Sequence, residues 1–94
     1  MNASLNRDGF IIVPEVFSGE QIQKMREISL NYFKEGGGFS NAGGLAKPDW
    51  IMDERLKDLV DLYNMEKIKQ IVSKCVEESV EFTEHNDLHL NRSV

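Results

Sequence analysis

The sequence predicts a small α+β domain with three helices, one short N-terminal strand and one long C-terminal strand, in a single unit spanning residues 1–94. In three segments apolar residues recur at three- and four-residue spacings, which is typical of amphipathic helices. Two other segments are typical of strands: residues 9–13 form an apolar, β-branched run, and residues 80–90 alternate between apolar and polar. A chain of 94 residues makes one domain at most, with a modest core.

The first strand is predicted at Gly9–Val13, which reads GFIIV and is ended by Pro14. Ser18 then begins a helix, because Ser18 and Gln21 have the spacing of a capping box and Phe17 and Ile22 occupy the two positions of a hydrophobic staple. Gly36 to Gly38 end this helix. Its apolar face consists of Ile22, Met25, Ile28, Tyr32 and Phe33.

Residues 36–50 (GGGFSNAGGLAKPDW) are expected to form a long glycine-rich loop without regular structure. Loops of this length are uncommon in compact domains and tend to be functional lids, binding loops or disordered connectors. Both interpretations, a flexible connector and a functional loop, stay open.

Two further helices and the long strand complete the prediction. Asp53 can cap the second helix, and Asn64 both ends it and can cap the third. The second helix carries Leu56, Leu59, Val60 and Tyr63 on one side; the third carries Met65, Ile68, Ile71, Val72, Cys75 and Val76. After Ser79 the period changes to two, with Val80, Phe82, Leu88 and Leu90 on one face of a strand and Glu81, Thr83, His85, Asp87, His89 and Asn91 on the other.

Composition and charge narrow the classes of partner. A net charge of −5, with 11 basic residues scattered among 16 acidic ones, argues against nucleic acid, whose binding depends on clustered Lys and Arg. The sequence also lacks the run of about 20 apolar residues that a membrane span requires, and its first residues do not resemble a secretory signal. A single cysteine, Cys75, fits a reducing compartment. We therefore expect a cytoplasmic protein that binds neither nucleic acid nor membrane.

His85, Asp87 and His89 form H-x-D-x-H, and two imidazoles with one carboxylate are the ligand set of non-haem iron oxygenases. In a straight strand, however, residues two apart are separated by about 6.5–7 Å, so His85 and His89 would lie about 13 Å apart. Ligands of one metal must approach it to about 2.0–2.2 Å. His85 and Asp87 can converge if the backbone bends. We therefore expect a polar strand face, with no metal ligands and no catalytic residues assigned.

The order of these features resembles a known family. Residues 5–26 (LNRDGFIIVPEVFSGEQIQKMR) resemble the opening of the phytanoyl-CoA dioxygenase-like family of iron- and 2-oxoglutarate-dependent oxygenases, whose members begin with a strand of the form DG-apolar-apolar-V and a Ser-initiated helix. Residues 56–94 are similar to the paired helices and long strand that follow in that family. The glycine-rich segment is the divergent part.

The resemblance implies the N-terminal portion of a double-stranded β-helix (jelly-roll) oxygenase acting on a small-molecule substrate. In the family Fe(II) is held by an H-x-D and a distal His, and all of these ligands, with the 2-oxoglutarate-binding Arg, are expected beyond this segment. His85 and His89 sit where some relatives line the 2-oxoglutarate pocket. The chain is therefore expected to be catalytically incomplete and to bind neither cofactor by itself.

Two alternatives remain open at this stage. The chain can be a non-catalytic module that forms a homo-oligomer through its unpaired strand, in place of pairing with a C-terminal oxygenase core. It can also be a small metal-binding domain in which His85, Asp87 and His89 are shared between subunits.

Overall fold

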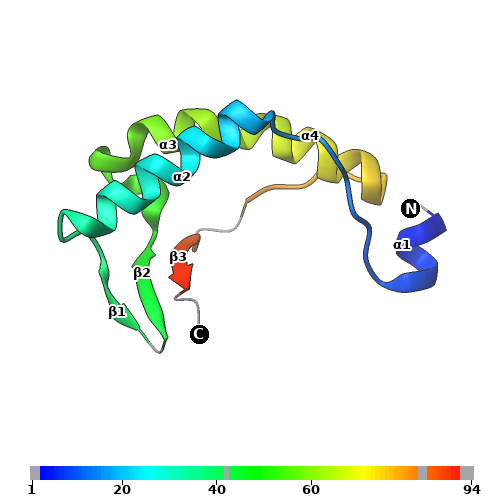
Figure 1. Cartoon of the computed structure of the whole chain (residues 1–94). Coiled ribbons are helices and arrows are strands. Elements are labelled where there is room, and N and C mark those ends of the chain that lie inside the picture. The colour runs from blue at the N-terminus through cyan, green and yellow to red at the C-terminus, as the bar shows by residue number, and fades with distance from the viewer. Residues whose placement is uncertain (1–2, 42, 83–84, 92–94) are drawn as a thin grey trace.

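The structure is a computed structural model, and it describes residues 3–41, 43–82 and 85–91 (Figure 1). Helices lie along one side of a small antiparallel sheet, and an extended N-terminal segment leads into them from the far end of the molecule. The elements in chain order are α1 (Ala3–Asp8), α2 (Gly19–Lys34), β1 (Phe39–Asn41), β2 (Gly44–Pro48), the 3-10 turns η1 (Trp50–Met52) and η2 (Glu54–Leu56), α3 (Lys57–Tyr63), α4 (Met65–Val76) and β3 (Asp87–Asn91).

Helix α2 begins as the sequence predicts. The Gln21 backbone N–H donates to Ser18 Oγ at 3.1 Å, and the Ser18 N–H donates to Gln21 Oε1 at 2.9 Å, so the capping box is present. The apolar face is buried progressively toward the C-terminal end, where Tyr32 and Phe33 enter the core. At the other end Ile22 remains half exposed, and the Phe17 ring stacks on Tyr63 at a centroid distance of 6.3 Å.

The predicted second and third helices are confirmed as α3 and α4. Asp53 Oδ1 accepts from the Arg55 N–H at 2.9 Å and caps η2, which leads directly into α3. Asn64 adopts a left-handed conformation (φ 53°) that ends α3, and its side chain accepts from the Lys67 N–H to begin α4. The short polar side chain of Asn tolerates this conformation better than most residues do.

The prediction that residues 36–50 lack regular structure is wrong, because they form the hairpin β1–β2. The register pairs Phe39 with Ala46 and Asn41 with Gly44, which leaves a two-residue connection that contains Gly43 at φ 79°. The central strand β2 also requires glycine at position 44, where a Cβ would overlap the carbonyl oxygen of Leu90 on β3. The glycines that suggested a loop therefore permit a tight turn and a close strand approach.

The predicted N-terminal strand at Gly9–Val13 is also wrong. Residues 10–13 are not part of a ladder, whereas the preceding Ala3–Asp8 forms a short helix, α1, that the sequence did not indicate. The Gly9 N–H donates to the Leu5 carbonyl at 2.9 Å and closes that helix. A strand needs a neighbour, and within the described residues no strand lies beside this run.

The C-terminal strand is shorter than predicted. Regular pairing covers Asp87–Asn91, while Val80–Phe82 pass along α4 without forming a ladder and Thr83 and Glu84 lie outside the described residues. The predicted alternation is confirmed within β3, where Leu88 and Leu90 are partly buried and the intervening residues are exposed. β3 pairs antiparallel with β2, so the sheet order is β1-β2-β3.

The core lies where α2, η2 and α3 meet the sheet. The fold combines helices with a small sheet, as the α+β prediction requires, and it has four α-helices among the described residues in place of three. Partly buried residues of α2, α3 and β3 pack around the core. The core consists of Tyr32, Phe33, Trp50, Leu56 and Leu59. In the described part of the chain, no helix combines the length and apolarity that crossing a membrane requires.

Candidate functional site

The two histidines and Asp87 gather at one end of β3. His85 precedes the strand, and its Nε2 lies 3.1 Å from Asp87 Oδ1. His89 lies within the strand, and its Nε2 is 3.8 Å from Asp87 Oδ2. His85 therefore reaches Asp87 from outside the regular ladder, and Asp87 contacts both imidazoles.

A second carboxylate approaches the same imidazole. Asp49 Oδ1 is 3.4 Å from His85 Nδ1, so both ring nitrogens of His85 lie close to a carboxylate oxygen. Asp49 follows β2 and adopts a left-handed conformation (φ 52°) before η1. Pro48 pairs with Asp87 across the sheet, and the Trp50 N–H donates to the Asn86 carbonyl at 3.3 Å. These contacts hold the two carboxylates on either side of the imidazole.

Sequence reasoning did not include Asp49 in this cluster. Asp49 and His85 are far apart in the chain, and only the pairing of β2 with β3 brings them together. The segment that holds Asp49 was expected to be an irregular loop, so its position could not be inferred. The useful signal was Gly43, because glycine can take the left-handed position of a two-residue hairpin turn.

The cluster is open to solvent. The side chain of His85 is 68% exposed, that of His89 49% and that of Asp87 30%. Exposed ion pairs of this kind contribute little to stability, so the contacts position the side chains more than they hold the fold together.

Among the described residues there is no group of three or more His, Cys, Asp or Glu side chains arranged to hold a metal ion. The carboxylates of an anion such as 2-oxoglutarate would be repelled by those of Asp49 and Asp87 beside the imidazole of His85.

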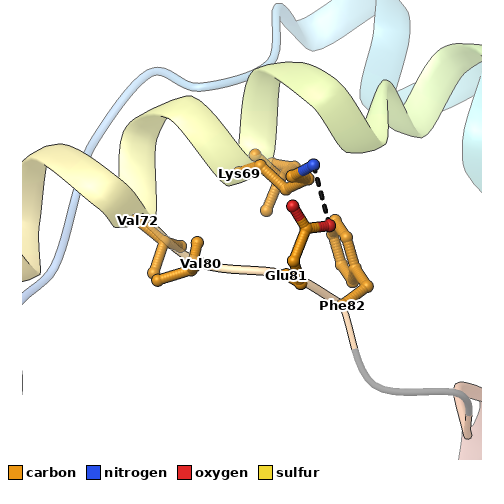
Figure 2. A pocket seen from close by; sticks show the side chains of 6 residues that line it. Lys69, Val72, Val80, Glu81 and Phe82 are labelled. Carbon is orange, nitrogen blue, oxygen red and sulfur yellow. Dashed lines mark ion pairs between the residues drawn. The ribbon is translucent and has the colours of Figure 1, made fainter. Parts of the chain in front are cut away.

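A shallow apolar groove lies elsewhere, between α4 and the segment that follows it (Figure 2). Lys69 Nζ pairs with Glu81 Oε2 at 3.0 Å across one end, and this hydrogen bond raises the pKa of Lys69. The Phe82 ring also contacts Tyr63, at a centroid distance of 6.3 Å. The free volume of the groove is about 160 Å³. Its walls are Ile68, Lys69, Val72, Val80, Glu81 and Phe82.

One partly buried polar contact joins α2 to the turns before α3. The Tyr32 hydroxyl donates to Asp53 Oδ2 at 2.7 Å, and the Arg55 guanidinium lies over the Tyr32 ring at 4.8 Å. The hydrogen bond from Tyr32 is the main reason that the pKa of Asp53 is lowered, and the Arg55 N–H contributes next. Burial, followed by this hydrogen bond, raises the pKa of Tyr32. The contact is structural, because Asp53 also caps η2.

Comparison with known proteins gives no match: no protein-family model, no curated protein and no solved structure is similar to this chain.

Proposed function

We propose that this chain is the N-terminal segment of an iron- and 2-oxoglutarate-dependent oxygenase of the phytanoyl-CoA dioxygenase-like kind, whose catalytic core lies outside residues 1–94. The observation that carries the proposal is the order of sequence features in residues 5–26 and 56–94. The capped helix α2 and the successive helices α3 and α4 support it, since they occupy the positions that the resemblance implies.

Two uncovered surfaces also support a larger assembly. Phe10 and Ile12 are 61% and 78% exposed, although they belong to the run GFIIV that resembles the family's first strand. Among the described strands, β3 pairs only with β2 and so presents an open edge. In this proposal α2, α3 and α4 form the outer layer that supports the oxygenase core.

The hairpin β1–β2 takes the role of a substrate-facing element in this proposal. It projects from the helical layer, and the residue that follows it, Asp49, reaches the histidine cluster (Figure 1). His85 and His89 would line the 2-oxoglutarate pocket once the core supplies the iron ligands and a cationic side chain for the anion. When the cofactors are bound, the family uses O2 to convert 2-oxoglutarate to succinate and CO2, with one oxygen atom entering succinate and the other entering a small organic substrate as a hydroxyl group.

The decisive experiment compares residues 1–94 with the complete reading frame that contains them. We expect the purified 94-residue chain to retain no stoichiometric iron and to release no succinate from 2-oxoglutarate. The complete product should contain an H-x-D soon after Val94, bind one iron and release succinate. A complete reading frame without that motif, or succinate release by the 94 residues alone, would refute the proposal.

The role of the histidines is tested in the complete product. Replacing His85 or His89 with Ala should raise the KM for 2-oxoglutarate and leave iron content unchanged, because neither residue is an iron ligand in this proposal. Asn91→Ala is the matched control, since Asn91 is an exposed polar residue of the same strand. Loss of iron in either histidine variant would instead make that residue a metal ligand.

A further inference from the structure

Residues 10–13 are an apolar strand sequence without a partner. Phe10, Ile12 and Val13 are 61%, 78% and 40% exposed. The backbone N–H and C=O groups of this run make no hydrogen bond to any other described residue. Exposed side chains of this kind and unsatisfied backbone groups both favour pairing with another strand.

The run is set apart from its neighbours at both ends. Gly9 has φ 80° and Glu15 has φ 60°, so a left-handed residue lies on either side of it. α1 precedes the run, and the N-cap of α2 follows it at Ser18. Residues 10–13 are therefore not part of a helix or strand of their own chain. A segment that is added as a strand to another sheet must be available in this way.

The same chain also contains a strand edge that can accept such a piece. β3 pairs with β2 on one side, and no described residue pairs with its other side. Leu88 and Leu90 point toward the core from this strand. Every second side chain of a strand added at this edge would extend the apolar face of the sheet. The backbone of the added strand would also hydrogen-bond to the N–H and C=O groups on the open side of β3.

Within one chain the two elements are held apart. The residues that follow the run are fixed on the helical layer, because the Lys67 ammonium donates to the Val16 carbonyl and the Phe17 ring stacks on Tyr63. Figure 1 shows the run in the segment that joins α1 to α2, and β3 in the sheet below the helices. Pairing with a second copy leaves the contacts of Val16 and Phe17 in place.

We propose that residues 10–13 of one chain add as a strand to the open edge of β3 in a second copy, and that the exchange is reciprocal. A two-fold dimer results, in which both donor runs and both edges are covered. The inference does not depend on the oxygenase proposal, because it uses only surfaces of these 94 residues.

The test is a concentration series of the 94-residue chain by size-exclusion chromatography with light scattering. The mass should rise to twice that of one chain as the concentration increases. NMR on a mixture of ¹⁵N-labelled and ¹³C-labelled chains should then give intermolecular contacts between residues 10–13 and residues 87–91. A monomer at millimolar concentration would overturn the proposal, as would intermolecular contacts from residues 10–13 to any other element.

Ile12→Pro and Ile12→Val form a matched pair of variants. Proline removes the backbone N–H that a new ladder would use, at a position where that N–H has no described partner. We expect Ile12→Pro to raise the dimer dissociation constant by about tenfold or more, with circular dichroism unchanged. Ile12→Val keeps the N–H and the β-branched side chain, so it should dimerise like the parent chain. Equal dimerisation of the two variants would overturn the proposal.

Discussion

The apolar residues around Leu56 are buried, whereas those of residues 10–13 are largely exposed to solvent. Leu56 is fully buried, and it lies in a cluster built from α2, η1, η2 and α3. Ile12 is 78% exposed, although the run GFIIV is more uniformly apolar than any helix of the chain. Local hydrophobicity is therefore not what separates the two regions.

The difference is whether an element needs a strand partner. A helix satisfies its own backbone, so α2 and α3 need only bring two apolar faces together, even though β1, β2, η1 and η2 lie between them in the chain. The backbone of an exposed extended run is hydrogen-bonded only to water, and its apolar side chains stay exposed, until another strand lies beside it. The helical body is therefore stabilised by contacts within its own chain, whereas residues 10–13 require a strand partner that the described residues do not supply.

The largest effect is expected at Leu56. Leu56→Ala should lower the free energy of unfolding by about 2–5 kcal/mol, because it leaves a cavity among residues that cannot fully collapse onto it. Urea denaturation followed by circular dichroism measures the change. Leu30→Ala is the control, since Leu30 is 41% exposed on α2 and should cost much less. Equal losses in the two variants would show that the cluster around Leu56 is not the core.

The next effect is expected at the sheet. Gly44→Ala should destabilise the chain by about 1–3 kcal/mol, because the new Cβ would overlap the Leu90 carbonyl oxygen and push β3 away from β2. Gly19→Ala is the control, since a Cβ at Gly19 would meet open space at the start of α2. Amide hydrogen exchange should show lost protection in β3 for Gly44→Ala alone. Unchanged protection there would contradict the close approach of the two strands.

The features that sequence could predict are those fixed by neighbouring residues. The capping box of Ser18 and Gln21 and the break at Asn64 act within one helical turn, and both are present as expected. The hairpin was missed because β2 contains Gly, Lys and Pro, which are depleted in strands, and β2 is held in place by pairing with β1 and β3. The strand at residues 9–13 was predicted wrongly for the opposite reason, since its propensity is strong and its partner is missing from the described residues.

The same distinction applies to the candidate site. H-x-D-x-H was visible as a motif, and the contact of His85 with Asp87 joins residues only two positions apart in the chain. The position of Asp49 depended on the register of β2 against β3, which no local pattern encodes. The pairing of Tyr32 with Asp53 likewise depends on how α2 packs against η2.

A smaller effect is expected for the Tyr32–Asp53 contact inside the helical body. Tyr32→Phe removes one hydrogen bond and should cost about 1 kcal/mol near neutral pH. The folded-state pKa of Asp53 lies below its ordinary value of 3.8, so this carboxylate stabilises the fold above that value and loses its contribution as the pH falls through the folded pKa. Stability of the variant should therefore fall less steeply with acidification below about pH 4.

Tyr63→Phe is the control for this prediction, because the Tyr63 hydroxyl makes no hydrogen bond to a described residue and its ring contacts are kept in the variant. Thermal unfolding measured from acid to neutral pH compares the two variants with the parent chain. If stability fell equally steeply with decreasing pH in Tyr32→Phe and in the parent chain, the lowered pKa of Asp53 would not depend on the tyrosine hydroxyl.

The smallest effect is expected for residues 10–13 themselves. Ile12→Asn, measured in dilute solution where the chain is a monomer, should change the free energy of unfolding by about 0.5 kcal/mol or less, because the side chain is already 78% exposed. The same substitution at Leu59, which is 4% exposed, would bury an unsatisfied amide and should prevent folding. At high concentration Ile12→Asn should weaken self-association, since it removes an apolar side chain from the donated strand. A large loss of stability in the dilute monomer would mean that residues 10–13 pack within their own chain, and the contrast between the two regions would then fail.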